Sequence, residues 1–244
     1  GETGGKDFLF AHRDCNIKAM SEALFCGAFE YQGQKCSATS RAYIPRSIWP
    51  QVSGLLKDRC SRAKLGDTSD LSVFMGAVID EKAFKKIVSY IELAKASPGE
   101  YRIISGASYE SSKGWFIEPT IIETTNPKSR LMEEEIFGPV LTVYVYDDDK
   151  LDETLELLDS TSPFALTGSI FANDRGVIER LTAALCETAG NFYINDKSTG
   201  AVVGQQPFGG ARASGTNDKA GSELNLMRWV SMRSIKENFS PPEV

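Results

Sequence analysis

One cysteine stands in a sequence context that is typical of a nucleophile. Cys36 follows a glycine and a lysine, Gly33 and Lys35, and precedes the small hydroxyl residue Ser37. A free thiol has a pKa of about 8.5 and is only about 3% thiolate at neutral pH, so a nucleophilic cysteine needs a nearby cation, backbone N–H donors or a general base. Gly33 permits a sharp bend that directs backbone amides at a reacting oxygen, and Lys35 is a neighbouring cation. The alternative is that Cys36 is a small buried apolar side chain, as most free cysteines are.

The composition is that of an ordinary globular protein. Of the 244 residues, 41% are hydrophobic and 25% are charged, which allows one large domain or two small ones. The net charge of −6 argues against a nucleic-acid surface, and no apolar run is long enough to span a membrane. The five cysteines are odd in number and form no C-x-x-C pair, which favours a reducing compartment. His12 is the only histidine, so most histidine-based triads and zinc sites are excluded, and no metal is expected.

Hydrophobic periodicity predicts an α/β fold with a largely parallel sheet flanked by helices. Apolar residues at i, i+3, i+4 and i+7 indicate helices, and runs of β-branched and aromatic residues indicate strands. The expected helices span 17–28, 49–60, 80–96, 151–158 and 177–185, and the expected strands span 7–11, 41–45, 101–105, 115–123, 140–146, 166–172 and 191–195. Strands alternate with helices through short connections, which is typical of parallel sheets. Residues 197–218, rich in Gly, Ser, Thr and Gln, are predicted to form a functional loop.

Glycine loops that cradle phosphates are absent from the sequence. No two glycines lie two positions apart, so a G-x-G-x-x-G loop is impossible, and no G-x-x-x-x-G-K loop occurs. The chain therefore carries neither of these phosphate cradles for a cofactor.

Three short segments together resemble the aldehyde dehydrogenase superfamily: Glu2-Thr-Gly-Gly-Lys6, Gly33-Gln-Lys-Cys36 and Glu134-Glu-Ile-Phe-Gly-Pro-Val140. Their order and separations make the combination specific. Two later segments, 192–200 and 205–218, resemble the branch of the family that oxidises glutamate γ-semialdehyde, the open form of Δ1-pyrroline-5-carboxylate, in proline breakdown. The resemblance covers essentially the whole chain and is closest to mitochondrial members, so it implies a location in the mitochondrial matrix.

The resemblance implies a covalent mechanism. Cys36 attacks the aldehyde carbon to give a thiohemiacetal, a hydride passes to NAD, and Glu2 activates the water that hydrolyses the resulting thioester. A carboxylate close to a thiol can act as the base for both the thiol and the water. The alternative for Glu2 is a frayed terminal residue without a partner.

The resemblance also implies three residues that contact the cofactor. The acidic residue at the position of Glu135 holds the ribose next to the nicotinamide, the residue at the position of Phe137 packs at the nicotinamide, and Lys35 is placed with them. The alternative is that Glu133, Glu134 and Glu135 form a solvated acidic face.

A pocket for the amino-acid end of the substrate is implied as well. Ser37 and the backbone amides of Gly221 and Ser222 are expected to bind its carboxylate, because charge-assisted hydrogen bonds are stronger than neutral ones. Arg212 is expected to be structural in the loop and not a carboxylate ligand.

An aromatic wall over the aliphatic part of the substrate is expected from Trp229 and Phe208. The alternative for both rings is ordinary packing in a core or an interface. Because its loop must admit substrate, Cys36 is expected to react with iodoacetamide before the other four cysteines.

The chain also departs from the family pattern. Family members carry a Rossmann-type NAD-binding domain and a bridging hairpin before the segment of Glu2, and neither is in this sequence, nor is the asparagine that stabilises the oxyanion with the Cys36 amide. Losing one such donor typically costs about 10²–10³ in rate. We interpret residues 1–244 as the thiol-bearing catalytic domain of an enzyme that forms a homodimer or larger homo-oligomer, and expect no hydride transfer from this chain alone.

Two other functions stay open at this point. One is a non-catalytic module that keeps the fold for carboxylate binding or assembly. The other is an NAD-independent thiol esterase that uses Cys36 and Glu2.

Overall fold

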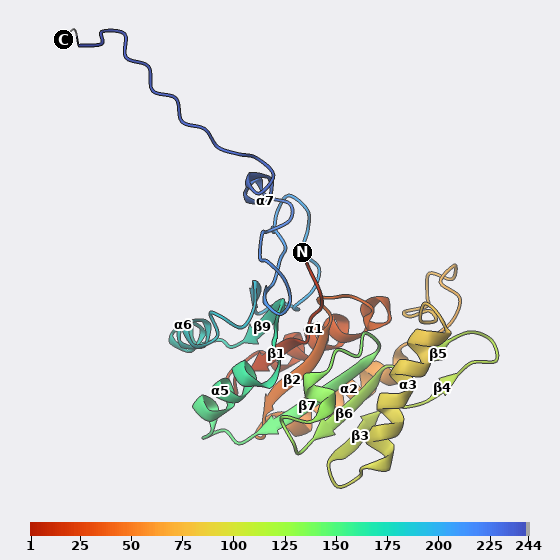
Figure 1. The fold of residues 1–244 in the computed structure, drawn as a ribbon. Coiled ribbons are helices and arrows are strands. Elements are labelled where there is room, and N and C mark those ends of the chain that lie inside the picture. Colours follow the sequence, from red (N-terminus) through yellow and green to blue (C-terminus); the bar gives the residue numbers. More distant parts are fainter. Residues whose placement is uncertain (243–244) are drawn as a thin grey trace.

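A seven-stranded sheet forms the centre of the molecule, with helices on both of its faces (Figure 1). The computed structural model describes residues 1–242. The strand order is β10-β9-β1-β2-β7-β6-β3, and every neighbouring pair is parallel except β3 and β6 at one edge. The predicted α/β fold with a largely parallel sheet is therefore confirmed.

The main elements agree with the predicted ones within a few residues. The strands of the sheet are β1 (Asp7–Ala11), β2 (Thr39–Pro45), β3 (Tyr101–Ser105), β6 (Thr120–Thr124), β7 (Val140–Tyr146), β9 (Thr167–Phe171) and β10 (Asn191–Ile194). The helices are α1 (Ile17–Phe29), α2 (Trp49–Arg62), α3 (Glu81–Ala96), α5 (Leu151–Thr161) and α6 (Arg175–Ala184).

Several short elements were not predicted. They are η1 (Glu30–Gly33), β4 (Tyr109–Glu110), β5 (Phe116–Ile117), α4 (Arg130–Glu133), β8 (Phe164–Ala165), β11 (Ala211–Arg212) and α7 (Glu223–Met227). The single strand expected over 115–123 is wrong, because the structure divides it into β5 and β6. Pro119 lies between the two, and a proline has no N–H to donate to a sheet ladder.

Alternate residues of the central strands face two different hydrophobic layers. Leu9 and Ala11 of β1 pack with α1 and α2 on one face of the sheet. Phe8 and Phe10 pack with α5 and α6 on the other face. Ile122 of β6 packs with α3, so the sheet is covered on both sides. Because a parallel sheet of this kind is buried on both faces, its strands read as nearly continuous apolar runs.

Side-chain caps fix where two of the helices begin. The Asn16 side chain accepts a hydrogen bond from the Ala19 amide at 3.1 Å, and the Asp80 side chain accepts one from the Ala83 amide at 2.7 Å. Each such cap contributes about 1 kcal/mol. Asn16 is therefore the N-cap of α1.

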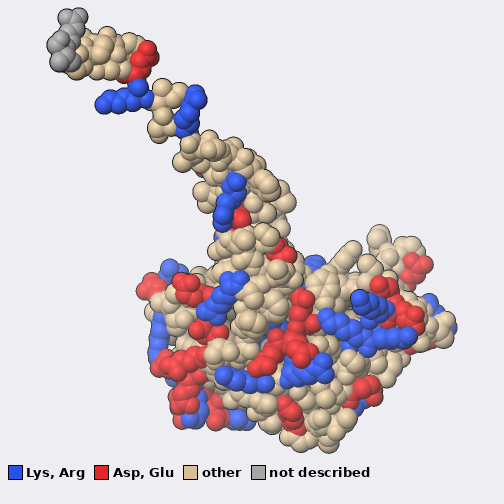
Figure 2. Space-filling view, viewed as in Figure 1, with Lys and Arg blue, Asp and Glu red and all other residues tan. Residues whose placement is uncertain are grey.

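After β10 the chain leaves the sheet. Residues 197–222, which we call the late loop, rise from the sheet beside the N-terminus, and residues 223–242, which we call the arm, extend away from it (Figure 1). Charges of both signs cover the visible face of the sheet-bearing part, and the arm also carries charged side chains of both signs among uncharged ones (Figure 2). Within residues 1–242, no helix has the length and apolar character needed to cross a membrane.

Candidate active site

Sheet topology brings the three family-like segments together. The first segment (residues 2–6) ends directly before β1, the thiol loop (residues 31–38) ends before β2, and the acidic segment (residues 134–139) ends before β7. Strands β1, β2 and β7 are adjacent and parallel, so their amino ends meet at one edge of the sheet. Segments about 30 and 100 residues apart in the chain therefore share one site.

Glycines allow these segments to approach each other closely. A Cβ atom on Gly5 would lie 2.5 Å from the carbonyl oxygen of Cys36, and one on Gly33 would lie 2.5 Å from that of Gly138. Gly33 also has a φ of +63°, in the left-handed region. Any larger residue at these two positions would separate the thiol loop from its neighbours.

The Cys36 thiol is partly buried and lies beside Glu2. Burial, a hydrogen bond to Glu2 and the negative charge of the Glu2 carboxylate together raise the pKa of Cys36 to about 12. The backbone amide of Ser37 acts in the opposite direction, because its hydrogen bond favours the thiolate. The thiol is consequently protonated at neutral pH, with a carboxylate in place to accept its proton. The structure thus brings together the two residues that the sequence assigned to the chemistry.

Backbone pairing with the late loop holds Glu2 in place. Glu2 forms an isolated antiparallel bridge with Gly215, and the Thr3 amide donates to the carbonyl of Ser214 at 2.9 Å. The amide of Thr216 donates to the carbonyl of Gly1 at 3.2 Å. Glu2 is therefore tied to the late loop and is not a frayed terminal residue.

A small cavity joins the thiol loop to the acidic segment. It measures about 10 Å³ and its walls include Gly5, Lys35, Cys36, Glu135 and Phe137. The predicted nucleophile and the three predicted cofactor residues therefore line one space.

Lys35 does not act as the cation that activates the thiol. Its ammonium lies 3.5 Å from Glu30 Oε2, and Glu30 also accepts hydrogen bonds from Lys197 Nζ at 2.7 and 2.9 Å. These two lysines hold the pKa of Glu30 below its usual range. The charge of Lys35 is thus directed at Glu30, and Glu2 is the charged group that most affects Cys36.

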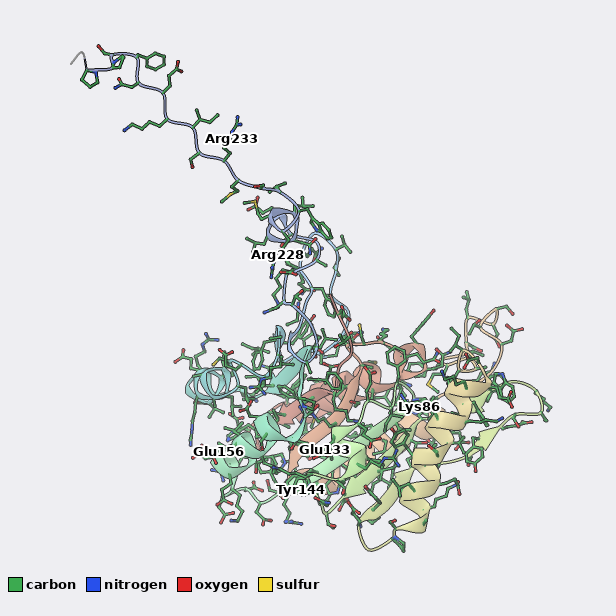
Figure 3. All side chains as sticks on the ribbon, viewed as in Figure 1. Lys86, Glu133, Tyr144, Glu156, Arg228 and Arg233 are labelled. Carbon is green, nitrogen blue, oxygen red and sulfur yellow. The ribbon has the colours of Figure 1, made fainter. Side chains whose placement is uncertain are left out.

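Glu135 and Phe137 both remain available to a ligand. Glu135 Oε1 accepts a hydrogen bond from the Gly5 amide at 2.9 Å, and its carbonyl accepts one from Lys86 Nζ at 2.8 Å. Figure 3 shows Lys86 on α3. Phe137 has a φ of +62° and is 41% exposed, although it is aromatic. Its ring lines a second cavity of about 510 Å³ together with Tyr31 and Ile79.

The acidic segment does not form a uniformly solvated face. Glu134 accepts hydrogen bonds from Tyr90 Oη at 2.6 Å and from Arg130 Nε at 2.8 Å, and these bonds hold the pKa of Glu134 below its usual range. Neighbouring glutamates thus have different partners: Glu134 binds α3 and α4, and Glu135 binds the first segment.

The residues predicted to bind the substrate carboxylate lie in two places. Ser37 is buried, and its Oγ lies 2.7 Å from Thr199 Oγ1 of the late loop. Gly221 is exposed with a φ of +87°. The Ser222 amide donates to the carbonyl of Lys219 at 3.1 Å, and the Ser222 hydroxyl donates to the same carbonyl at 2.7 Å. In this conformation the Ser222 amide is therefore already bonded within the loop.

The two predicted aromatic residues differ in their surroundings. Phe208 pairs with Ala220 through hydrogen bonds of 2.9 and 2.7 Å, which places it beside Gly221. Trp229 follows α7 and is 83% exposed, so it forms no wall with Phe208 here. Arg212 donates to the carboxylate and the carbonyl of Asp159 at 2.6 and 3.0 Å, which is the structural role expected for it.

Some residues near the site were not singled out from the sequence. Ser198 Oγ lies 2.8 Å from Thr39 Oγ1, which adds a second contact between the late loop and the start of β2. Lys6 and Asp7 are almost fully buried at the start of β1. The only sequence signal for them is a charged pair at the start of an apolar strand. No group of three or more potential metal-ligating side chains occurs in the part of the chain that the structure describes.

The exposure of the cysteines changes one expectation. Cys186 is exposed, whereas Cys36 is only partly exposed and has a raised pKa. Since the thiolate is the species that iodoacetamide attacks, Cys36 is no longer expected to react first.

Comparison with known proteins identifies the family. The family model described as "Aldehyde dehydrogenase family" matches residues 1–235. The chain belongs to the aldehyde dehydrogenase family. Among curated members, it is 61% identical over 241 residues to mitochondrial delta-1-pyrroline-5-carboxylate dehydrogenase from Dictyostelium discoideum and 52% identical over 242 residues to that from Homo sapiens. Each match covers 99% of this chain and 43% of the relative.

Solved structures of aldehyde dehydrogenases agree. The chain superposes on the delta-pyrroline-5-carboxylate dehydrogenase of Mycobacterium tuberculosis bound with NAD with a TM-score of 0.90 and 48% identity, covering 99% of this chain and 44% of that one. It superposes on the NAD-bound Thermus 1-pyrroline-5-carboxylate dehydrogenase with a TM-score of 0.82 and 36% identity, covering 93% and 42%. The chain thus spans less than half the length of these relatives and matches a portion of each.

Proposed function

We propose that residues 1–244 form the thiol-bearing catalytic domain of an NAD-dependent dehydrogenase that oxidises L-glutamate γ-semialdehyde to L-glutamate. The observation that carries this proposal is the position of the Glu2 carboxylate beside the Cys36 thiol, at an edge of the sheet where the acidic segment also lies. The similarity to pyrroline-5-carboxylate dehydrogenases supports the substrate.

The first covalent step uses Cys36 and Glu2. Glu2 takes the thiol proton as Sγ bonds to the aldehyde carbon, and the carbonyl electron pair moves to oxygen to give a thiohemiacetal. Because the resting thiol is protonated, the base is needed at the moment of attack. Loss of a hydride from the carbon then restores the C=O bond and leaves a thioester on Cys36.

NAD, when bound, accepts that hydride. Glu135 would hold the adjacent ribose, because a carboxylate accepts hydrogen bonds from two neighbouring hydroxyls, and the exposed ring of Phe137 would pack against the nicotinamide. Lys35 lines the same cavity. An upstream Rossmann-type domain would supply the adenosine and pyrophosphate contacts.

Hydrolysis of the thioester completes the cycle. Glu2 first releases the thiol proton to solvent. It then removes a proton from a water molecule that adds to the acyl carbon and passes this proton to the Cys36 sulfur as the sulfur leaves, so the products are a carboxylic acid and the free thiol. The same carboxylate thus acts on the thiol first and on the water later.

Ser37 and the late loop are proposed to bind the amino-acid end of the substrate. The amides of Gly221 and Ser222 would bind the substrate carboxylate after Ser222 exchanges its bond to Lys219 for one to the ligand. Phe208 lies next to this turn, and Trp229 would reach the substrate only if the arm folds back over the site.

The test is a pair of variants in the full-length enzyme. Cys36→Ala should abolish oxidation of the semialdehyde, and Glu2→Gln should slow both the first formation of NADH and the later hydrolysis of the thioester, because Glu2 is the base in both steps. Stopped-flow absorbance at the NADH band measures both. Normal steady-state oxidation by Cys36→Ala would refute the proposal.

A thiol esterase is the second candidate, because Cys36 and Glu2 lie together within this chain. Hydrolysis of a p-nitrophenyl ester by the chain alone, lost in Cys36→Ala, would support it. A non-catalytic module would bind glutamate equally well with and without Cys36, and calorimetry separates that case.

The arm supports an assembly role within the proposed enzyme. Its large apolar side chains are exposed between 47% and 88% (Leu224, Leu226, Met227, Trp229, Val230, Met232, Ile235 and Phe239). A surface of this kind marks an interaction site, so we propose that the arm packs against another part of the longer enzyme or a second copy in a homodimer or larger homo-oligomer. Because the relatives are named as mitochondrial, we propose the mitochondrial matrix as its location.

A further inference from the structure

A lysine near the site is buried without a hydrogen-bond partner. Lys6 is 1% exposed, and its Nζ bonds to none of the residues that the structure describes. Arg41 Nε donates to the Lys6 carbonyl at 2.8 Å, which fixes this residue at the start of β1. A buried ammonium without a partner is costly, so its presence calls for an explanation.

Four ionisable residues influence the charge of the Lys6 ammonium: Arg41 of β2, Asp7 of β1, and Glu134 and Glu135 of the acidic segment. Both oxygens of Glu134 already accept hydrogen bonds, as described above. Burial raises the pKa of Asp7 to about 8, which leaves it largely uncharged at neutral pH. Asp7 Oδ1 accepts the Thr167 amide of β9 at 2.7 Å, whereas Glu135 is the carboxylate that bonds the backbone directly before Lys6.

Glu135 lies directly on the backbone that precedes Lys6. Its Oε1 accepts the Gly5 amide at 2.9 Å, and a Cβ atom on Gly4 would lie 3.1 and 3.3 Å from its two carboxylate oxygens. Within residues 1–242, no donor forms a hydrogen bond with Glu135 Oε2. One oxygen is thus used to hold the first segment, and the other is available.

We propose that Lys6 is a positioning residue, whose buried charge holds the Glu135 carboxylate on the Gly5 amide with Oε2 turned toward the cofactor site. The identity of the ligand at Oε2, the ribose of NAD, rests on the proposed function, whereas the link between Lys6, Glu135 and Gly5 does not. Because Gly5 joins Glu2 to β1, the same contact also fixes the approach of Glu2 to Cys36.

The pH dependence of this link follows from burial. Desolvation, and then the charge of Arg41, lower the pKa of Lys6 to about 7. Lys6 therefore loses its proton as the pH rises through neutrality, and its hold on Glu135 weakens above that point.

Nuclear magnetic resonance of this chain tests the link without any cofactor. The sequence contains two Gly-Gly pairs, Gly4-Gly5 and Gly209-Gly210, so labelling with ¹³C-carbonyl and ¹⁵N glycine selects the amides of Gly5 and Gly210 alone. The Gly5 amide should shift with pH with a midpoint near neutrality, and Lys6→Met should change its shift and remove that midpoint. Gly210 serves as the internal reference. Because Asp7 has a pKa of about 8 and its Oδ2 lies beside Gly5, the comparison is made in an Asp7→Asn background, where a Gly5 titration that persists after Lys6→Met would overturn the proposal.

Two control variants separate Lys6 from its neighbours. Lys86→Met removes a cation that bonds only the carbonyl of Glu135, and Asp7→Asn removes the other buried group that titrates near neutrality. Both should leave the Gly5 midpoint in place. Loss of the midpoint in Asp7→Asn but not in Lys6→Met would assign it to Asp7 and refute the role of Lys6.

Binding of NAD by the full-length enzyme tests the consequence. Lys6→Met should weaken NAD binding by about tenfold, the factor that corresponds to one pKa unit of interaction, and should leave the thermal midpoint unchanged or higher because a buried unpaired charge is removed. A lower thermal midpoint with unchanged NAD affinity would indicate a structural role only. If the unaltered enzyme binds no NAD, the proposed function fails, while the magnetic resonance result for Gly5 still decides the link.

Discussion

The thiol loop and the arm are two regions that differ in how the chain supports them. The thiol loop lies between β1 and β7, with backbone contacts so close that only glycine fits at Gly5 and Gly33. The arm extends from the sheet and exposes most of its apolar side chains (Figures 1 and 2). The contrast shows that the proposed reactive residues Cys36 and Glu2 are held by contacts within this chain, whereas the arm, including exposed Trp229, has few such contacts beyond the ion pair of Arg228 with Asp218.

Substitution of two glycines with left-handed backbones, Gly33 in the thiol loop and Gly221 in the late loop, should give the largest difference in the free energy of unfolding. Gly33→Ala should lower the free energy of unfolding by about 2–4 kcal/mol, because left-handed strain adds to a clash with the carbonyl of Gly138. Gly221→Ala has comparable strain but nothing within 4 Å of the added Cβ, so a loss of about 1 kcal/mol is expected. Urea unfolding measures both, and equal losses would remove the distinction between the regions.

The contact between the thiol loop and the late loop should have a measurable energy. Ser37→Ala or Thr199→Val leaves one buried hydroxyl without its partner and should cost about 1–3 kcal/mol. The double variant should lose less than the sum, with a coupling of about 1 kcal/mol in a double-mutant cycle. Ser231→Ala, in the exposed arm, is the control and should change stability by less than about 0.5 kcal/mol. Additive losses would mean that the two loops fold independently.

Alkylation of the cysteines tests the pairing of Glu2 with Cys36. At pH 8, iodoacetamide should modify exposed Cys186 before Cys36. The pKa of Cys36 is about 12, so its thiolate fraction, and with it the rate of its alkylation, should rise with pH over the whole range up to that value. Glu2→Gln removes a negative charge beside the thiol, which lowers its pKa and should raise the rate at Cys36 about tenfold per pKa unit. Peptide mass spectrometry follows each site, with Cys186 as the control. Equal rates at Cys36 with and without the Glu2 carboxylate would disprove the pairing.

Removing an exposed ring from the arm should have the smallest effect. Trp229→Ala should change the stability of this chain by less than about 0.5 kcal/mol, since the side chain is 83% exposed. Trp49, which is 6% exposed and donates to Glu123 at 2.7 Å, is the matched residue in the sheet-bearing part. A large thermal shift in Trp229→Ala would show that the arm packs against the rest of the chain in solution.

Local patterns predicted the elements of the sheet well and the short elements poorly. Helix α3 and strand β7 have strong periodicity, and both were found within a residue of their expected bounds. The turn η1 contains Tyr31 and Gln32 with positive φ values, which neither residue favours by itself. Its conformation depends on contacts with Gly138, distant in the chain, so no local pattern could indicate it.

The sequence by itself indicated the candidate residues for chemistry, because a cysteine, an acid and glycines in these short segments have specific reactivity and backbone freedom wherever they lie. It also determined the helices and strands, since apolar periodicity is a local property. Only the tertiary structure decided that β1, β2 and β7 are neighbours, and this adjacency places the amino ends of three distant segments at one edge. The raised pKa of Cys36 and the buried charge of Lys6 also belong to the tertiary structure, because desolvation and a nearby charge arise only when the segments pack together.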